Sequence, residues 1–562
     1  MSFQQIPRCK INLKCLIVKS SEHRNQMDHL DIFGEQYKDG EDSDSDDELE
    51  SIAMDHLEEG DVEEEDDEMK LGITAAEARA NYEAAGSEVN EEEDRITIAD
   101  NTHLMNSDVN AILDKVVDEI QMPYKPAEFQ RVAINALVGL NNVILISPTG
   151  SGKMNVPLLA TLVLREKLGI PKGVCIVTQP LSSIMKEKMK NDVCPAAVLS
   201  MGGGLTTSTD TDDEDASLSC NLDELLQGSF PVLFGHPESF DTKIGQHILK
   251  NLQKLDRLIL ICIDEFHQGG QGHWSSFRPS MMQGSAGLRL FGVKNCPSLA
   301  MTATSTESEI KEVVTALGLR SPPIILTSSP VQSHIKISIV RRPANNFGLD
   351  GTVTSKGEKK PGLMDLLLRA CLRQHLEDLE RGKKPKKCLI FCRGNGVLGA
   401  IYSRLIELTN YKYKDCWDSP IVMNHSSLLP PTEKVLADRS SEISLYLTTN
   451  KMLLGIDLAE IDLVIFLRPY NQPAALIQGG GRGGRRLESG KRRRVQVYQF
   501  FNSQDFSSQN KMMSPDMKRI CLSKDCTRKL LKEYFVGDEK EEDVGEEVKR
   551  HCCHNCDRLA VS

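Results

Sequence analysis

The sequence lacks any apolar run that approaches the roughly 18 residues needed to cross a bilayer, which argues against a membrane-spanning protein. It also lacks the basic-plus-apolar N-terminal segment of a secretory signal. Its sixteen cysteines are scattered along the chain. We therefore expect a protein of a reducing compartment that has no membrane partner.

Basic residues are scarce in the first part of the chain. Residues 1–96 contain 9 Lys and Arg against 29 Asp and Glu, whereas the remaining 466 residues carry 58 basic and 52 acidic side chains. Within this part, the stretch 41–68 has too much like charge and too little apolar surface to offset the entropy of ordering. We predict that 1–96 is a disordered acidic arm, which either docks protein partners or is only a solubilising spacer.

Short apolar runs alternate with helical patterns along the rest of the chain. They lie at 142–147, 174–178, 231–235, 257–263 and 298–303, and again at 388–392, 421–424, 444–449, 462–467 and 495–501. Such alternation predicts parallel sheets with helices on both faces. We expect an α/β protein with two tandem domains, 97–328 and 329–510, and a small module at 511–562. A helix is expected over 107–121, with Ser107 as its N-cap.

The stretch ILISPTGSGKMNVPLLA, 144–160, reads as a buried strand, a glycine-rich turn and an apolar helix. This pattern is typical of a loop that binds the phosphates of ATP through backbone N–H groups and a lysine. An ordinary strand-to-helix turn is the alternative. The residues of the predicted loop are Ser147, Pro148, Thr149, Gly150, Ser151, Gly152, Lys153 and Met154.

Met154 departs from the usual loop, in which a Ser or Thr hydroxyl follows the lysine and supports Mg²⁺. A thioether is soft and Mg²⁺ prefers hard oxygen ligands, so Met154 should not replace that hydroxyl. A water held by Asp264 could take its place. We expect reduced turnover of Mg²⁺-ATP without loss of nucleotide binding.

A second apolar strand ends in Asp264 and Glu265, within ICIDEFH at 261–267. Carboxylates at the carboxyl end of a parallel strand lie where open α/β sheets bind ligands. One carboxylate can hold Mg²⁺ while the other orients or deprotonates the attacking water, as phosphoryl transfer requires. A helix-capping acidic pair is the alternative. With the upstream loop, the pair predicts a site for ATP and Mg²⁺.

A series of motifs in one order resembles superfamily 2 helicases, and within them the RecQ family. They are YKPAEFQ (124–130), SPTGSGK (147–153), QPLSSIMKEK (179–188), FGHPESF (234–240), DEFH (264–267), AMTATS (300–305), NHSSLLPPTEK (424–434), TTNKMLLGIDLAEIDLVIF (448–466) and QGGGRGGR (478–485). The resemblance implies two RecA-like domains that close on a single strand when ATP binds. It runs from Tyr124 to Asp557.

The resemblance also implies individual roles. Gln130 would read the adenine, and Gly455 and Asp457 would couple the nucleotide cleft to nucleic acid. Arg482 and Arg485 would act as arginine fingers, placing positive charge where charge develops on the γ-phosphate. The alternative for GGGRGGR is a flexible RNA-binding tract. The expected catalytic residues are Lys153, Asp264, Glu265, His267, Gln478, Arg482 and Arg485.

Aromatic residues follow the acidic pair in QGGQGHWSSFRPS, 268–280. Trp274, Phe277 and Arg278 would offer stacking faces and a cation to single-stranded bases. The stretch resembles the aromatic-rich loop by which RecQ helicases link DNA binding to hydrolysis, although His273 precedes Trp274 here. The alternative is that the two aromatic residues belong to the core.

Cysteines cluster near the C-terminus. Cys526 opens an amphipathic helix, and HCCHNCD follows at 551–557. This pattern suits tetrahedral thiolate ligation of Zn²⁺. The helix resembles its RecQ counterpart, and the cluster looks like the zinc module of the Werner helicase, which implies a ligand set. That set is Cys526, Cys552, Cys553 and Cys556, with Cys521, His551 and His554 in reserve. Unrelated free cysteines are the alternative.

The sequence thus predicts an ATP-dependent DNA helicase that moves on single-stranded DNA and unwinds partly duplex DNA. The 3′-to-5′ polarity is implied by the resemblance alone. Because no winged-helix domain follows the cysteines here, we expect weak unwinding. The basic clusters at 383–387 and 491–494 are either nuclear import signals or nucleic-acid contacts. The alternatives are a catalytically weakened nucleic-acid-binding or scaffold protein and an RNA helicase.

Overall fold

The structure is a computed structural model of the whole chain. It describes residues 74–89, 101–122, 124–180, 185, 193–200, 204–207, 222–269, 288, 296–319, 322–327, 332–342, 352–353, 359–360, 362–409, 419–425, 428, 432, 435–436, 438–449, 461–484, 492–507, 513–535 and 552–556. Among these residues, no helix combines the length and the apolar character needed to span a membrane.

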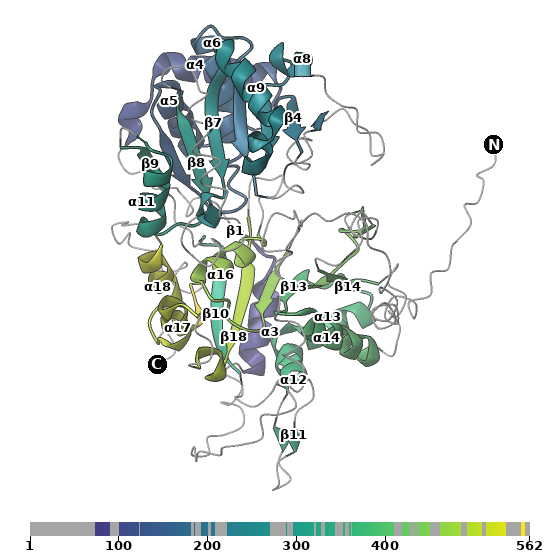
Figure 1. Cartoon of the computed structure of the whole chain (residues 1–562). Coiled ribbons are helices and arrows are strands. Elements are labelled where there is room, and N and C mark those ends of the chain that lie inside the picture. The colour runs from purple at the N-terminus through teal and green to yellow at the C-terminus, as the bar shows by residue number, and fades with distance from the viewer. Residues whose placement is uncertain are drawn as a thin grey trace, which may run out of the picture. The chain divides into compact units, whose positions relative to one another are not determined.

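The first domain is built on a mostly parallel sheet (Figure 1). Its strands are β2 (Val143–Ile146), β3 (Val174–Thr178), β4 (Ala196–Leu199), β5 (Leu205–Thr207), β6 (Val232–Gly235), β7 (Leu258–Asp264), β8 (Ser298–Thr302) and β9 (Ile324–Thr327). They lie in the order β5, β4, β6, β3, β7, β8, β2, β9. The β4–β5 pair is antiparallel, and the other neighbours pair in parallel.

Helices cover both faces of this sheet because its strands are apolar on both faces. Val143 and Leu145 of β2 pack against α4, α5 and α6, whereas Ile144 and Ile146 pack against α11. The helices are α4 (Ser107–Glu119), α5 (Glu128–Val138), α6 (Asn155–Lys167), α8 (Leu222–Leu226), α9 (Lys243–Lys254) and α11 (Glu307–Ala316), with 3-10 turns η4 (Asn101–Leu104), η5 (Pro237–Asp241) and η6 (Phe266–Gly269).

The N-terminus of α4 differs by one residue from the prediction. Ser107 is already helical, and Asn106 is the N-cap. The Asn106 side-chain oxygen accepts hydrogen bonds from the backbone N–H groups of Asp108 and Val109 at 2.9 and 3.2 Å. Both residues are good caps, so the sequence alone does not separate them.

The second domain has a parallel sheet of its own. Its strands are β10 (Ile335–Arg341), β13 (Cys388–Phe391), β14 (Ile421–Asn424), β15 (Leu445–Thr448), β16 (Leu463–Phe466) and β18 (Val495–Phe501), in the order β10, β18, β16, β13, β15, β14. The short pair β11 (Thr352–Val353) and β12 (Lys359–Lys360) is antiparallel. The predicted fold class, two tandem domains built on parallel sheets, is confirmed.

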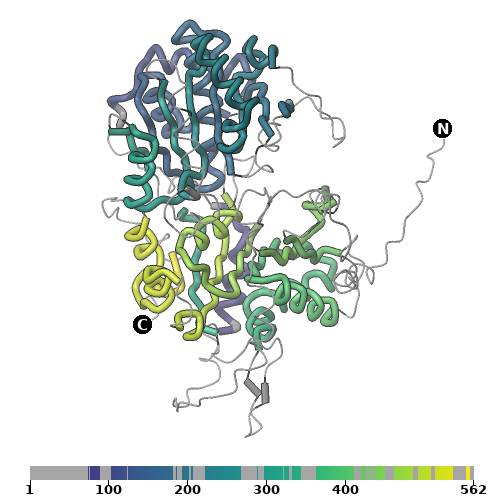
Figure 2. Tube along the Cα trace, in the orientation of Figure 1, coloured from purple at the N-terminus to yellow at the C-terminus, as the bar shows by residue number. Residues whose placement is uncertain are grey.

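The two faces of the second sheet carry different helices. Cys388 and Ile390 of β13 face α3 (Ala75–Ala84), α12 (Leu363–Leu367), the π-helical turn η8 (Leu368–Leu372), α13 (Arg373–Glu380) and α14 (Asn395–Leu408). Leu389 and Phe391 face α16 (Pro473–Gly480), α17 (Pro515–Leu522) and α18 (Thr527–Tyr534). The 3-10 turn η10 (Gln504–Phe506) follows β18. In Figure 2 the C-terminal helices lie beside the second sheet, so the C-terminal module covers one of its faces.

Helix α3 corrects the prediction that residues 1–96 are disordered throughout. Thr74 and Glu77 form a capping box at its start, and Tyr82 is buried in the core of the second domain. Figure 1 shows this purple helix among the green and yellow elements of the second sheet. The prediction failed because it used the net charge of residues 1–96 as a whole and did not consider the short apolar face of Ala78, Tyr82 and Ala85.

The chain stays on the second domain after α3. Strand β1 (Glu88–Val89) pairs antiparallel with β17 (Arg492–Arg493). Gly86 has a φ of 75°, and a Cβ there would lie 2.6 Å from an Asp462 oxygen, so a glycine is required. The described segment 74–89, which we call the N-terminal strap, thus belongs to the second domain although it precedes the first in sequence.

Candidate nucleotide site and cysteine cluster

The predicted phosphate loop follows β2 at the carboxyl edge of the first sheet. Gly150 and Gly152 have φ values of 80° and 81°, a left-handed backbone that L side chains rarely adopt. The loop then enters α6 at Asn155. A left-handed glycine loop running into a helix N-terminus turns backbone N–H groups toward an anion, which is the geometry that phosphate binding needs.

Gln130, on α5, is hydrogen-bonded to this loop. Its side-chain Nε2 donates to the Gly152 carbonyl at 2.8 Å, and its Oε1 accepts from the Ala127 N–H at 2.8 Å. The side chain is buried. The structure therefore brings Gln130 to the predicted loop, and its role toward adenine stays a prediction.

Asp264 ends β7 and lies buried near Lys153. Burial, together with the neighbouring Glu265 carboxylate, raises the pKa of Asp264 to about 7. The Lys153 ammonium acts in the opposite direction, so the loop lysine and this carboxylate share one electrostatic environment. A bound cation would favour the ionised carboxylate further.

Gln179 is a member of this site that the sequence reading did not single out. It follows β3, the strand next to β7, and its Nε2 donates to Asp264 Oδ2 at 2.6 Å. A signal was present in the sequence, because Gln179 opens QPLSSIMKEK, one of the motifs that resemble the RecQ family.

Glu265 holds a strained backbone beside the buried His267. Its φ of 52° is uncommon for a residue with a side chain, and such strain concentrates at functional sites. Its Oε2 lies 3.3 Å from His267 Nδ1. Glu265 of the predicted acidic pair thus contacts His267, which is also one of the predicted catalytic residues.

His267 links the two domains through hydrogen bonds. Gln478 on α16 of the second domain donates from Nε2 to His267 Nε2 at 3.1 Å. That acceptor role places the ring proton on Nδ1, which lies 2.6 Å from Thr302 Oγ1 at the end of β8. Thr302 donates in turn to the Thr304 carbonyl at 3.1 Å. We call Gln478, His267, Thr302 and Thr304 the interdomain relay.

The glycines around Arg482 are needed for packing. A Cβ at Gly481 would lie 3.1 Å from the Ile477 carbonyl, tighter than an ordinary contact, and 3.5 Å from Thr149 Cβ of the phosphate loop. A Cβ at Gly483 would come within 2.9 Å of the Ile461 carbonyl, and Gly484 has a φ of 65°. Arg482 itself is buried. The alternative of a flexible RNA-binding tract is therefore wrong for the described residues 478–484.

Met154 lies at the start of α6 and packs against the apolar core of the first domain. The expectation that Met154 does not replace the missing hydroxyl stays a prediction. Ser147 and Ser151 have hydroxyl oxygens 2.7 Å apart in the same loop.

Several predicted residues lie outside the described residues. They are Trp274, Phe277 and Arg278 of the aromatic stretch, Gly455 and Asp457, Arg485, and His551. Their proposed roles stay predictions.

The two basic clusters take part in the fold. The Lys386 N–H donates to the Tyr82 hydroxyl of the strap at 3.1 Å, and the Lys387 ammonium donates to the Ser440 carbonyl at 2.8 Å. Arg493 pairs with Asp462 at 2.7 Å. Lys383 and Lys384 remain exposed, so the import interpretation of these clusters stays a prediction.

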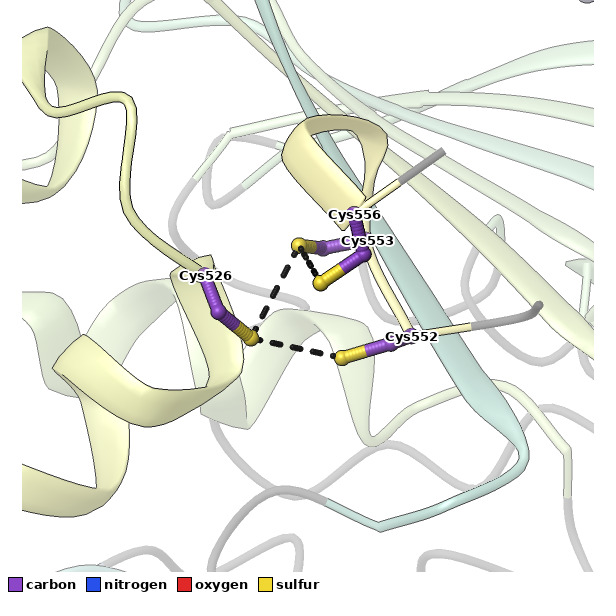
Figure 3. Close-up of side chains that lie close together, drawn as sticks. All are labelled: Cys526, Cys552, Cys553 and Cys556. Carbon is purple, nitrogen blue, oxygen red and sulfur yellow. Dashed lines mark hydrogen bonds between the residues drawn. The ribbon is translucent and has the colours of Figure 1, made fainter. Parts of the chain in front are cut away.

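Four cysteines converge at the C-terminal module (Figure 3). The sulfurs of Cys526, Cys552, Cys553 and Cys556 lie within 4.8 Å of one another. The Cys526 sulfur is 3.4 Å from that of Cys552 and 3.9 Å from that of Cys553, and Cys553 and Cys556 are 3.6 Å apart. A tetrahedral Zn²⁺ with bonds of about 2.3 Å separates its sulfurs by roughly 3.8 Å. The four thiols therefore fit zinc, and none of them forms a disulfide.

The reserve ligands do not join this cluster among the described residues. Cys521 on α17 is buried in the core of the second domain, where burial raises the pKa of its thiol. His554 lies between Cys553 and Cys556 in the sequence and is buried. It is not one of the groups that converge on the cluster.

Comparison with known proteins matches two domain families on this chain. The DEAD/DEAH box helicase family matches residues 127–313, and the helicase conserved C-terminal domain matches residues 368–486. The first span contains the phosphate loop and the acidic pair, and the second contains Gln478 and Arg482. The two matched spans thus meet at the interdomain relay.

Curated relatives are helicases that are longer than the matched region. "ATP-dependent DNA helicase Q-like 5" of Arabidopsis thaliana is 24% identical over 360 residues, which cover 63% of this chain and 34% of that protein. "ATP-dependent helicase Lhr-Core" of Saccharolobus solfataricus is 24% identical over 384 residues, covering 66% and 40%. The chain therefore spans between a third and two fifths of the length of these relatives.

A solved structure shares the fold. "DUF1998 helicase MrfA bound to DNA" superposes with a TM-score of 0.52 at 14% identity, over 77% of this chain and 52% of that chain. At this identity the likeness shows the fold alone, and it agrees with two tandem RecA-like domains.

Proposed function

Because the chain carries a DEAD/DEAH box helicase domain and a helicase conserved C-terminal domain, we propose that it is an ATP-dependent DNA helicase of RecQ type. It would use ATP hydrolysis between its two RecA-like domains to move on single-stranded DNA. The observation that carries the proposal is the interdomain relay, in which Gln478 of the second domain reaches His267 beside the acidic pair.

Each half of the site has a distinct task in this proposal. The phosphate loop and Lys153 would bind the phosphates of ATP, and Asp264 would hold Mg²⁺, which would supply positive charge to them. Glu265 orients the attacking water. Arg482 places positive charge at the γ-phosphate when the domains close. The relay reports the nucleotide state of the first domain to α16 of the second.

DNA is the proposed substrate, and 3′-to-5′ is the proposed polarity. Support for DNA comes from the relatives, several of which are named DNA helicases, and from the cysteine cluster, which resembles the RecQ zinc module. The grip on DNA would be mainly through phosphates and therefore weaken with salt. A DNA substrate favours the nucleus as the site of action, and the acidic residues before the strap are proposed to dock protein partners.

Zinc is proposed as a structural metal of the C-terminal module. Cys526 at the start of α18 and the three later cysteines would hold it. Since the module covers a face of the second sheet, zinc would stabilise the packing of the module on that face. It would take no part in ATP hydrolysis.

The test is an ATPase assay of the full chain at low salt, with zinc bound, in the absence of nucleic acid and with single-stranded DNA or RNA. We expect DNA to stimulate hydrolysis and Lys153→Ala to abolish it. A wild-type protein that binds ATP but shows no stimulation would refute the helicase proposal. Stronger stimulation by RNA than by DNA would move the substrate to RNA.

A second candidate is a catalytically weakened nucleic-acid-binding protein, which the Met154 substitution favours. Strand displacement on partial duplexes with a single 3′ or 5′ tail separates the two. The helicase proposal expects displacement only from the 3′-tailed duplex. Binding without displacement from either duplex supports the weakened protein.

A further inference from the structure

The side-chain amide of Gln179 is buried at the nucleotide site, and only its nitrogen makes a hydrogen bond among the described residues. Its backbone N–H donates to the Gly235 carbonyl at 3.0 Å, and its own carbonyl accepts from His236 Nδ1 at 2.8 Å. These contacts fix the residue between β3 and β6. The side chain is fully buried.

The amide group faces Asp264. Its Nε2 donates to Asp264 Oδ2 at 2.6 Å, which assigns the nitrogen to the carboxylate side. The Oε1 atom is buried and has no hydrogen-bond partner among the residues that the structure describes. Because both amide atoms share one carbon, this oxygen lies within a few ångströms of Asp264 Oδ2. A buried unpartnered oxygen is costly, and a group that binds there would relieve that cost.

The phosphate loop lacks a hard oxygen at position 154. The phosphate loop has Met154 where a hydroxyl normally supports Mg²⁺, and the partly buried Met154 side chain packs against the core. Carbonyl and carboxylate oxygens are the protein ligands that suit Mg²⁺. Asp264 and Gln179 therefore provide one charged and one neutral hard oxygen in the same region of the site.

We propose that Gln179, through Oε1, takes over the role of the missing loop hydroxyl and binds the nucleotide-associated Mg²⁺ directly or through one of its waters. This inference rests on the proposed function, because it concerns the metal of that same ATP site. It makes Gln179 and Met154 a compensating pair, so a hydroxyl at 154 would make Gln179 dispensable.

The experiment measures how strongly Mg²⁺ tightens binding of a fluorescent ADP analogue, as the ratio of Kd in EDTA to Kd in Mg²⁺. Gln179→Met keeps the shape but removes both amide atoms. Gln179→Glu keeps a hard oxygen but removes the donor to Asp264. Gln499→Met is the matched control, since Gln499 is also a buried glutamine with an unpartnered Oε1 and lies on β18 of the second domain.

We expect Gln179→Met to lower the ratio by about 10- to 100-fold, the usual cost of losing an ordered metal contact. Gln179→Glu should keep or raise the ratio, and Gln499→Met should leave it unchanged. In a Met154→Thr background, Gln179→Met should have little effect. Thermal unfolding of each variant confirms that the fold is retained, and the Met154→Thr pair keeps the test valid if Gln179→Glu does not fold.

Two results would overturn the proposal. One is an equal loss of the ratio in Gln179→Met and Gln179→Glu, which would make Gln179 only a positioning residue for Asp264. The other is wild-type protein that binds the analogue equally well with and without Mg²⁺. Absence of any nucleotide binding would instead refute the proposed function itself.

Discussion

Tyr82 of the N-terminal strap should stabilise the second domain, although it lies before the first domain in the chain. The side chain is 4% exposed and packs with the core that includes Leu366 and Ile390. Its hydroxyl donates to Asp378 Oδ2 at 3.1 Å and accepts from the Lys386 N–H at 3.1 Å. Burial raises the pKa of this hydroxyl, so it stays protonated.

Replacing Tyr82 with Ala removes an aromatic side chain from a closed core. Such changes cost about 3–5 kcal/mol. Tyr82→Phe keeps the ring and removes only the hydroxyl, which leaves the Lys386 N–H without its acceptor and should cost about 1–3 kcal/mol. Glu83→Ala on the same helix breaks only an exposed ion pair with Arg79 and should cost under about 0.5 kcal/mol.

Hydrogen exchange followed by mass spectrometry measures where the stability is lost. Tyr82→Ala should speed exchange in β13 and β15 of the second sheet and leave β2 and β7 of the first sheet unchanged. The order of effects should be Ala above Phe above the Glu83 control. Faster exchange in the first sheet alone, or equal behaviour of Tyr82→Ala and Glu83→Ala, would refute the assignment of the strap to the second domain.

Three further predictions concern other parts of the molecule. Gln478→Ala should lower DNA-stimulated ATPase about tenfold, since a hydrogen bond of about 1.4 kcal/mol corresponds to that factor, while ADP binding stays unchanged; unchanged stimulation would exclude the relay. Cys526→Ser should remove the zinc measured by elemental mass spectrometry, whereas Cys521→Ala should keep it; the reverse pattern would reassign the ligand. Burial lowers the pKa of His375 to about 4 in the folded protein. Between pH 6.5 and 4 the unfolded chain therefore binds a proton that the folded protein does not. The free energy of unfolding should fall by up to about 3 kcal/mol as the pH is lowered through this range. His375→Gln should flatten that part of the pH profile, and an unaltered slope in urea denaturation would contradict the role of His375.

Most strands of the two sheets could be predicted because their local pattern is strong, but β4, β5, β9 and β10 are not among the predicted runs. Apolar runs such as 257–263 and 462–467 are too apolar for an exposed strand, and each is buried on both faces of a parallel sheet. The glycine-rich turn and the acidic pair could also be located from the sequence, since their spacing is local, and their roles toward ATP stay predictions. The placement of Gln130 against the loop agrees with its motif but could not be derived from that motif.

The N-terminal strap shows why a local reading failed. The T-x-x-E capping box at Thr74 was a usable signal for a helix start. The stabilising partners of that helix lie some three hundred residues later in the chain, at Asp378 and Lys386. Average charge over 1–96 therefore predicted disorder where distant contacts supply the stability.

The sequence by itself determined the order of strands and helices, the phosphate loop, the acidic pair and the cysteine spacing, because each depends on neighbours within a few residues. Only the tertiary structure decided which side chains meet. It brought Gln179 to Asp264, Gln478 to His267 and the strap to the second sheet. These contacts join residues far apart in sequence, and their existence depends on how the two sheets and their helices pack.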